Sequence, residues 1–207
     1  MNFTLYVDSL FTSPWAMSTF VALKEKQLDF SLKTVDLEAG AARIPAFRDF
    51  SMTARVPALV HGDFILTESS AIQEYLEELF PANEYAALYP KNSQDRARAR
   101  QLQAWIRSDF QPLRAERDTE MVFFQKPHAP LSEAAQAAAA KLVAAAERLI
   151  QGPYLFDKWC VADLDLAMML QRLITTGEPV PEKVAAYANA QFQRPAVQQW
   201  LAFHQPA

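Results

Sequence analysis

Cysteine is almost absent from this chain of 207 residues, in which Cys160 is the only one. A disulfide within the chain and a CxxC redox pair are therefore both excluded. The three histidines, His61, His128 and His204, lack the spacing of metal ligands, and we expect no metal site. Because free cysteines are usually buried and inert, we interpret Cys160 as a small buried residue at a helix start, with a reactive thiol as the alternative.

Basic residues are outnumbered by acidic ones, 20 against 24, which gives a formal net charge of -4 and an isoelectric point near 5.4. This balance argues against nucleic acid as a partner. No apolar run reaches the ~18 residues that indicate a membrane span. The first residues read as a strand and not as the basic region and apolar core of a signal peptide. We therefore expect a cytoplasmic protein.

Strand-like and helix-like segments alternate through the first 80 residues. Apolar and polar residues alternate at the start of the chain, as they do in a half-buried strand. Ser13 is a good N-cap, and Pro14 is well placed as the first residue of a helix. The expected elements are strands over residues 3–7, 30–35, 58–60 and 64–67, a helix from Pro14, an irregular, partly helical stretch between Gly40 and Pro45, and a helix that stops at Pro81.

The chain is organised around two neighbouring stretches, Arg55-Val56-Pro57-Ala58-Leu59 and Glu68-Ser69-Ser70-Ala71-Ile72. Val56 precedes a proline, which favours an extended backbone. An extended segment can pair with a short peptide as an added strand does, and a polar helix N-terminus can bind its carboxylate. The alternative is a plain strand-turn-helix in which Ser70 and Gln73 form a capping box.

Everything after residue 92 reads as helix. Ser93 can cap a long helix, and Pro112 within its pattern predicts a kink or a break. Two prolines predict a loop over residues 126–131, after which Ser132 starts an alanine-rich helix that runs to about residue 150. Cys160 then stands at the cap position of another helix, with Asp163 as its N3 residue.

These stretches resemble the cytosolic glutathione transferase family. Val56-Pro57-Ala58-Leu59 and Glu68-Ser69-Ser70-Ala71-Ile72 are similar to its glutathione-binding half, and Cys160-Val161-Ala162-Asp163 stands where the family has a Ser/Thr-x-x-Asp capping box. The likeness is strongest to the serine-type, bacterial YfcF-type branch, with some zeta and theta likeness. It implies an α/β thioredoxin-like domain of order βαβαββα over residues 1–80, a linker over 81–92, an all-α domain over 93–207, and a homodimer.

The resemblance also implies how glutathione would be held. In that family the proline is cis, and the backbone of the preceding residue pairs with the cysteinyl part of the tripeptide. Those positions are Pro57 and Val56 here, while Glu68 and Ser69 would hold the γ-glutamyl end. By likeness to a zeta-class stretch, Gln111 would also reach glutathione, across a dimer interface as one option.

Ser13 is the candidate for activating the glutathione thiol. Glutaredoxin-like and omega-class relatives have Cys-Pro at this point, whereas this chain has Ser13-Pro14. A serine cannot form a mixed disulfide, but it can donate a hydrogen bond to a thiolate at a helix N-terminus. Thr12 is the alternate, and a helix cap without a catalytic role is the other interpretation of Ser13.

The electrophile is expected between the two domains, in a pocket lined by apolar groups. Its candidate residues are aromatic: Phe11, Trp15, Trp105 and Phe123. Arg114 and Arg117 could attract an anionic electrophile, but we interpret them as a solvated charged face beside Glu116 and Asp118. A maleylacetoacetate-isomerase assignment is weakened because the zeta Ser-Ser-Cys signature reads Phe11-Thr12-Ser13 here.

The resemblance implies a glutathione transferase that joins glutathione, its co-substrate, to small hydrophobic electrophiles, with glutathione-dependent peroxidase activity as a further option. Two alternatives stay open: a non-catalytic interaction module with the same fold, and a glutathione-dependent disulfide reductase.

Overall fold

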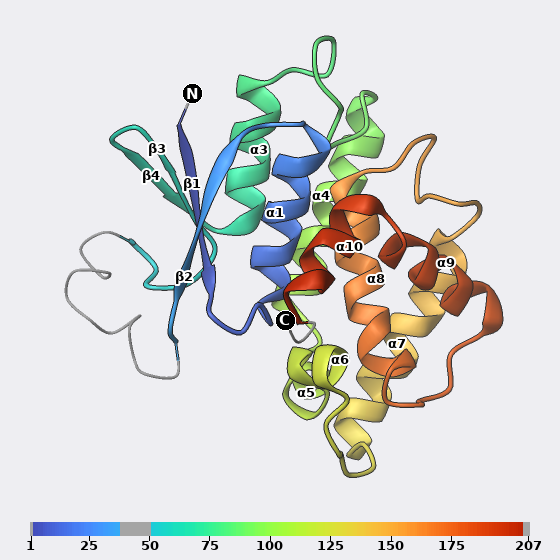
Figure 1. The fold of residues 1–207 in the computed structure, drawn as a ribbon. Coiled ribbons are helices and arrows are strands. Elements are labelled where there is room, and N and C mark those ends of the chain that lie inside the picture. The colour runs from blue at the N-terminus through green and yellow to red at the C-terminus, as the bar shows by residue number, and fades with distance from the viewer. Residues whose placement is uncertain (1, 38–50, 205–207) are drawn as a thin grey trace. The chain divides into compact units, whose positions relative to one another are not determined.

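The computed structural model describes residues 2–37 and 51–204 (Figure 1). Residues 38–50 include the irregular stretch expected between Gly40 and Pro45, so this prediction lies outside the described residues. The chain divides into two compact units. We call Met1–Leu88 together with Gln199–Ala207 the first unit, and Tyr89–Gln198 the helical unit.

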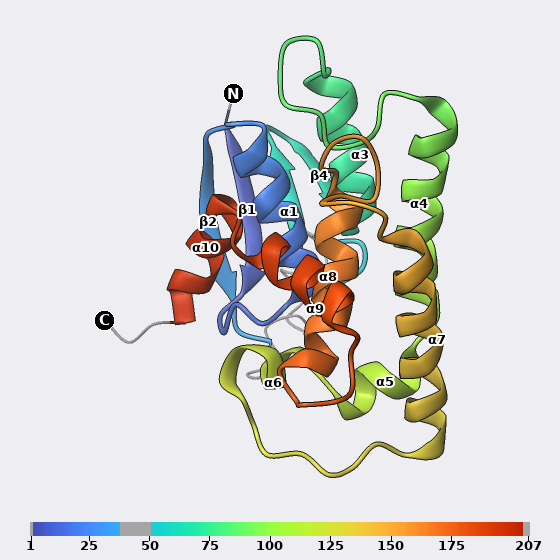
Figure 2. The same ribbon diagram turned by 90° about the vertical axis from the view of Figure 1, so that its right-hand side faces the viewer.

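The first unit contains a mixed four-stranded sheet in the order β2-β1-β3-β4. The strand β1 is parallel to β2 and antiparallel to β3, and β3 is antiparallel to β4. Two helices, α1 and α3, lie side by side on one face of this sheet (Figures 1 and 2). The bounds are Phe3–Asp8 for β1, Pro14–Glu25 for α1, Phe30–Val35 for β2, Ala58–His61 for β3, Phe64–Thr67 for β4 and Ser69–Leu79 for α3.

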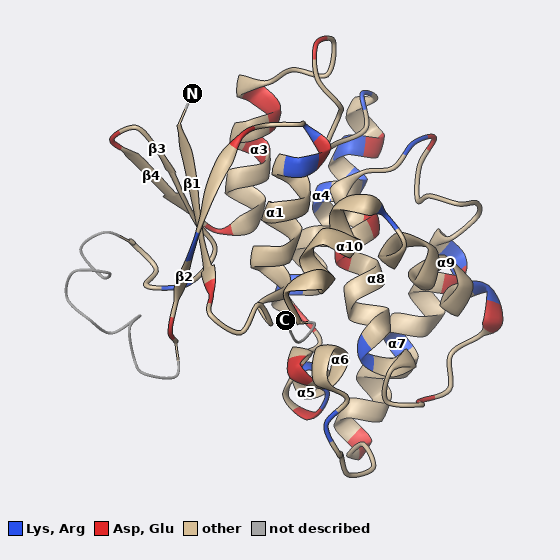
Figure 3. Ribbon diagram, in the orientation of Figure 1, with Lys and Arg blue, Asp and Glu red and all other residues tan. Residues whose placement is uncertain are grey.

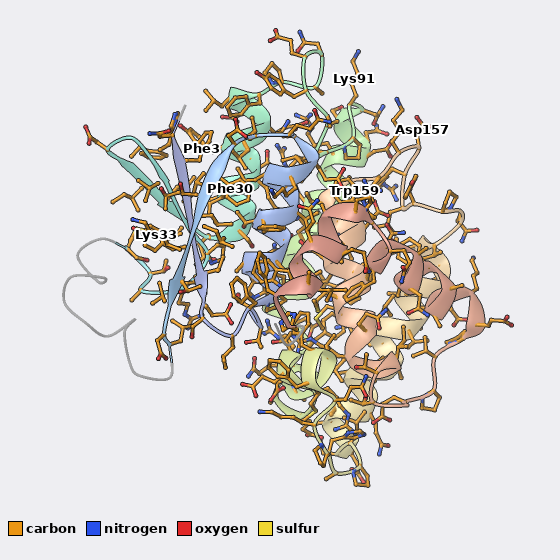
Figure 4. All side chains as sticks on the ribbon, viewed as in Figure 1. Phe3, Phe30, Lys33, Lys91, Asp157 and Trp159 are labelled. Atoms are coloured by element: carbon orange, nitrogen blue, oxygen red, sulfur yellow. The ribbon has the colours of Figure 1, made fainter. Side chains whose placement is uncertain are left out.

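The core of the first unit is built from the inward side chains of the sheet and of both helices. Leu5 on β1 and Leu59 on β3 are buried, as are Phe20 on α1 and Ile72 on α3. Aromatic rings extend this core: Phe30 packs edge-on against Phe20, and Phe3 packs against Phe80. Phe3 and Phe30 are labelled in Figure 4. The expected thioredoxin-like α/β arrangement is confirmed.

The first unit also includes the end of the chain, from Gln199 onward. Trp200 is buried and packs edge-on against Phe11, with 5.4 Å between the ring centroids. Phe203 stacks on Phe11 at 4.4 Å. These contacts explain why residues from Gln199 onward belong to the first unit.

The helical unit is arranged around α8, which is buried along its length except at its last residue. Because α8 faces protein on nearly all sides, most of its residues are apolar, and its four polar side chains, Asp163, Asp165, Gln171 and Arg172, are buried as well. The bounds are Ser93–Ser108 for α4, Gln111–Glu116 for α5, Thr119–Phe124 for α6, Glu133–Leu149 for α7, Val161–Ile174 for α8, Glu182–Phe192 for α9 and Pro195–Leu201 for α10. The end of α10 and the 3-10 turn Ala202–His204 that follows it belong to the first unit.

The helix starts of this unit agree in part with those predicted from the sequence. Ser132 caps α7 by accepting a hydrogen bond from the backbone N–H of Ala135. The cap of α4 is Asn92 and not Ser93, because the Asn92 side chain accepts from two backbone N–H groups of the first turn. The predicted break at Pro112 is confirmed: α4 ends at Ser108, and the proline lies in the first turn of α5.

The start of α8 depends on one buried carboxylate. Asp163 accepts hydrogen bonds from the backbone N–H groups of Cys160 and Leu155, both at 2.8 Å, and from the hydroxyl of Tyr187 at 2.7 Å. Burial raises the pKa of Asp163. Burial and the nearby charge of Asp163 raise the pKa of the Cys160 thiol, which therefore stays protonated at neutral pH. Cys160 is buried as predicted, and its raised pKa favours the inert interpretation.

Within residues 2–37 and 51–204, no helix is both long enough and apolar enough to cross a bilayer. The same described part of the chain contains no group of three or more histidine, cysteine, aspartate or glutamate side chains arranged to hold a metal ion.

Candidate functional site

The loop between β1 and α1 is fixed by a single carboxylate at the end of β1. Asp8 is 5% exposed and accepts three hydrogen bonds: from the Thr12 backbone N–H at 2.6 Å, from the Thr12 hydroxyl at 3.0 Å and from the Ser13 backbone N–H at 3.0 Å. Asp8 therefore sets the position of Ser13. The sequence analysis missed this role, because an aspartate after a strand also suits an ordinary loop.

Ser13 is the N-cap of α1, as predicted. Its Oγ accepts a hydrogen bond from the backbone N–H of Ala16 at 3.2 Å, and Pro14 begins the helix. Accepting a hydrogen bond leaves the hydroxyl proton of the serine available to a second partner. The first turn of α1 carries no acidic residue, so the positive end of the helix dipole is not neutralised from within the helix. Half-exposed Ser13 can therefore both cap its helix and donate to an anion.

Thr12, the alternate candidate, is placed differently. Its hydroxyl donates its single proton to Oδ2 of Asp8. To serve an anionic ligand, Thr12 would have to give up this hydrogen bond. The geometry therefore favours Ser13 as the donor.

Phe11 is held by the end of the chain. Its backbone is in the left-handed region, with φ of 55°, and its carbonyl oxygen accepts hydrogen bonds from Nε1 of Trp200 at 3.0 Å and Nε2 of His204 at 3.1 Å. Its ring packs on Trp200 and Phe203. This candidate pocket residue is thus also a structural member of the first unit.

Val56 and Pro57 lie just before β3. The peptide bond between them is cis, as the resemblance implied. Among the residues that the structure describes, no hydrogen bond joins the backbone of Val56 to another group. Such a backbone is able to pair with an extended ligand.

Glu68 occupies the N-cap position of α3 in an unusual conformation. Its φ of 69° and ψ of 112° lie outside the regions that side chains other than glycine favour. The side chain is exposed and makes no capping hydrogen bond, whereas the following Ser69 is 3% exposed. Strained residues cluster at ligand sites, where the strain is part of the function. Sequence reasoning missed this feature, since no local pattern required glutamate to adopt it.

The capping box suggested for Ser70 and Gln73 is wrong. Helix α3 begins at Ser69, so Ser70 is already inside the helix. Gln73 is fully buried and donates from Nε2 to Oγ of Ser18 on α1 at 2.7 Å. Gln73 therefore joins two helices instead of capping its own.

We expect the Glu68→Gly variant to be as stable as the parent or more stable, while its affinity for glutathione falls. Glycine relieves a backbone strain of roughly 1–3 kcal/mol, and its greater freedom when unfolded offsets about 1 kcal/mol of that gain. Chemical denaturation and calorimetric titration with glutathione measure the two effects. Glu68→Gln keeps the strain and serves as the control. A marked loss of stability in the glycine variant would contradict the assigned strain.

The other candidates are divided between the units. Trp15 is half-buried on α1, Phe123 is half-buried on α6, and Gln111 is exposed at the first position of α5. Trp105 donates from Nε1 to Asp109 at 3.0 Å. It also lines an open groove of about 700 Å³ within the helical unit, together with Gln94, Asp95, Arg98, Gln101, Leu102, Ala145, Arg148, Leu149, Leu155 and Phe156.

The interpretation of Arg117 as part of a solvated face is wrong. Arg117 is 1% exposed, and its guanidinium pairs with Glu178 at 2.5 Å and donates to the backbone carbonyl of Ala129 at 2.8 Å. Arg114 is half-exposed and donates from Nη2 to Oε1 of Gln111 at 3.1 Å. The two arginines therefore have different environments although they are three residues apart.

Comparison with known proteins identifies the fold. Residues 12–79 match the family description "Glutathione S-transferase, N-terminal domain", and residues 92–205 match "Glutathione S-transferase, C-terminal domain". The chain belongs to the glutathione S-transferase family. Each unit accordingly has the architecture of one half of this family, an α/β thioredoxin-like domain and a helical domain.

Three relatives show how far the similarity extends. Glutathione S-transferase 3 of Zea mays is 32% identical over 202 residues, which cover 91% of this chain and 83% of the relative. Glutathione S-transferase 1 of Dianthus caryophyllus is 41% identical over 109 residues, or 53% of this chain, but the match spans only 47% of the relative. The structure of a glutathione transferase homolog from Burkholderia GL BGR1, solved with bound glutathione, is 47% identical, has a TM-score of 0.82, and covers 99% of this chain and 98% of that one.

Proposed function

We propose that this protein is a serine-type glutathione transferase that joins the glutathione thiolate to small hydrophobic electrophiles. The observation that carries the proposal is the hydroxyl of Ser13, which accepts the capping hydrogen bond and keeps its proton for another group. Family membership and the 47% identity to a homolog solved with glutathione support glutathione as co-substrate. The finer likeness to the YfcF-type branch stays a prediction.

Glutathione would be held along the edge that leads from β3 to α3. The backbone of Val56, beside the cis bond to Pro57, is suited to pair with the cysteinyl part of the tripeptide. The exposed Glu68 and the start of α3 at Ser69 are suited to its γ-glutamyl end. Gln111 stays a further candidate contact.

The chemical task is to supply thiolate at neutral pH. A free thiol has a pKa of about 8.5, so only a few per cent is ionised at pH 7. A hydrogen bond from Ser13 and the positive end of α1 both favour the ionised form, and each unit of pKa depression corresponds to about 1.4 kcal/mol. The thiol proton leaves to solvent. The sulfur then attacks the carbon that bears a halide, the carbon–sulfur bond forms, and halide departs with the bonding electrons.

The electrophile would meet apolar side chains, with Phe11, Trp15, Trp105 and Phe123 as the candidates. A homodimer and a cytoplasmic location accord with the family. A peroxide is a second class of acceptor for the same thiolate, with oxidised glutathione as the product once a second glutathione has reacted.

Two measurements test the function directly: retention on immobilised glutathione, and turnover of an aryl halide with glutathione. We expect both. Binding without any turnover would instead favour an interaction module. Turnover of mixed disulfides or hydroperoxides, with none of aryl halides, would favour a reductase or peroxidase. Failure to bind glutathione would overturn the proposal.

A further inference from the structure

A buried arginine in the helical unit lacks the partners that such a group normally has. Arg172 lies in the last turn of α8 and is 4% exposed. Its Nη1 donates to the backbone carbonyl of Arg117 at 2.6 Å. Its Nε is buried and has no protein acceptor, and no carboxylate forms an ion pair with Arg172 among the residues that the structure describes.

The neighbouring Arg117 shows how this fold satisfies a buried guanidinium when the role is structural. Arg117 pairs with Glu178 through both Nε and Nη2, and it also donates to the carbonyls of Glu116 and Ala129. Its charge is balanced and its donors are used. A buried charge without such compensation costs several kcal/mol. Arg172 thus needs an explanation that Arg117 does not.

A second incompletely bonded arginine, Arg114 on α5, stands three residues before Arg117, whose carbonyl accepts from Arg172. Its Nε is also buried without a protein acceptor. The two charges repel each other: burial and the charge of Arg114 lower the pKa of Arg172 to about 10. The charge of Asp118 raises the pKa of Arg172 in turn, but Asp118 is exposed. One of its carboxylate oxygens also caps α6 by accepting from the backbone N–H of Met121. Asp109 favours the charged form of Arg114, but its carboxylate is also paired with Lys141. The three basic side chains Arg114, Lys141 and Arg172 therefore outnumber the two carboxylates of Asp109 and Asp118. Figure 3 shows that basic and acidic residues both occur around α5 and α7.

We infer that Arg114 and Arg172 form a binding site for the carboxylate group of a small organic acid. A carboxylate matches the planar fork of a guanidinium, and one negative charge offsets this excess of basic side chains. Half-exposed Arg114 provides the donor on the solvent side, and Arg172 provides the buried one. Gln111, which already accepts from Arg114, holds the outer arginine in position. This inference goes beyond the proposed transferase activity and does not depend on it.

Thermal unfolding of the full chain with benzoate, and with benzamide as an uncharged analogue of the same size, tests the site. A ligand that binds only the folded state raises the midpoint in a concentration-dependent way. We expect benzoate at saturating concentration to raise it by roughly 2–4 °C, and benzamide to leave it unchanged. Equal shifts with the two compounds, or none with benzoate, would overturn the inference.

Variants assign the effect to the two arginines. We expect Arg172→Met to abolish the benzoate shift, and Arg114→Met, which alters a half-exposed side chain and leaves the core intact, to weaken benzoate binding at least tenfold. Arg98→Met removes an exposed arginine of α4 and should keep the full shift. An unchanged shift in both Arg114→Met and Arg172→Met would show that benzoate binds elsewhere.

Stability without ligand separates a binding role from a structural one. Because its buried charge is not balanced, replacing Arg172 by methionine is expected to leave the midpoint unchanged or to raise it. Replacing Arg117 by methionine should lower the midpoint strongly, because Glu178 then loses its partner. A comparable loss in the Arg172 variant would show that Arg172 serves the fold instead of a ligand.

Discussion

Replacing Ser13 by alanine is expected to lower turnover by roughly 10- to 100-fold, while glutathione still binds. A hydrogen bond to a charged group is worth about 1.5–3 kcal/mol, which corresponds to that range of rate. The same loss should raise the pKa of the bound glutathione thiol by about one to two units. Steady-state kinetics and ultraviolet titration of the thiolate measure the two effects on one sample.

Two further variants separate the catalytic role of Ser13 from its role as a helix cap. Loss of the cap alone costs about 1 kcal/mol of stability. Ser13→Thr keeps both the hydroxyl and the cap, and should retain most of the activity. Thr12→Val removes the hydroxyl that donates to Asp8, and should change turnover much less than Ser13→Ala. Equal turnover in Ser13→Ala and the parent protein would reject the assignment, and a larger loss in Thr12→Val would transfer the role to Thr12.

Replacing Lys26 by methionine is expected to destabilise the protein by about 3–5 kcal/mol. Lys26 is the C-cap of α1 and is 1% exposed. Its ammonium group lies 2.8 Å from a carboxylate oxygen of Glu77 on α3 and donates to the carbonyls of Phe80 and Ala86. Glu77 in turn accepts from the backbone N–H of Leu88. The substitution leaves a buried carboxylate without its cation and frees the segment after α3.

Urea denaturation measures this loss as a lower midpoint at an unchanged slope. Lys24→Met, two residues earlier on the exposed side of α1, is the matched control and should shift the free energy of unfolding by no more than about 0.5 kcal/mol. The double variant Lys26→Met with Glu77→Gln should recover part of the loss, because no unpaired charge stays buried and the amide oxygen can still accept from Leu88. Purely additive effects would show that the pair does not act as a unit.

Local patterns were sufficient for much of the fold. The strands follow from alternation and from short apolar runs, and the starts of α1 and α7 follow from Ser13 and Ser132, because a cap is a contact within one turn. The errors concern side chains whose partners are distant in sequence. Gln73 reads as a capping residue until Ser18, 55 positions away, is placed beside it.

The candidate site, like the fold, could be predicted from the sequence only in part. The position of Ser13 could be read from the residues around it, and the likeness to a known family supplied the places of Val56, Glu68 and Ser69. The carboxylate of Asp8, the strained backbone of Glu68 and the uncompensated charge of Arg172 could not be read in this way. Each of them is defined by geometry or burial, which the order of residue types does not encode. Arg117 was misjudged for the same reason, since its partner Glu178 lies 61 positions further along the chain.

The hydrogen bonds from Trp200 and His204 to the carbonyl of Phe11 join residues 189 and 193 positions apart. A ribosome makes the chain from its N-terminus, so the carbonyl of Phe11 gains these two donors only after Trp200 and His204 have been added to the chain. The helical unit is complete in sequence earlier, at Gln198. The bonds of Asp8 with Thr12 and Ser13 join residues four and five positions apart and can form early, whereas the carbonyl of Phe11 is bonded only once residues 200 and 204 have been made.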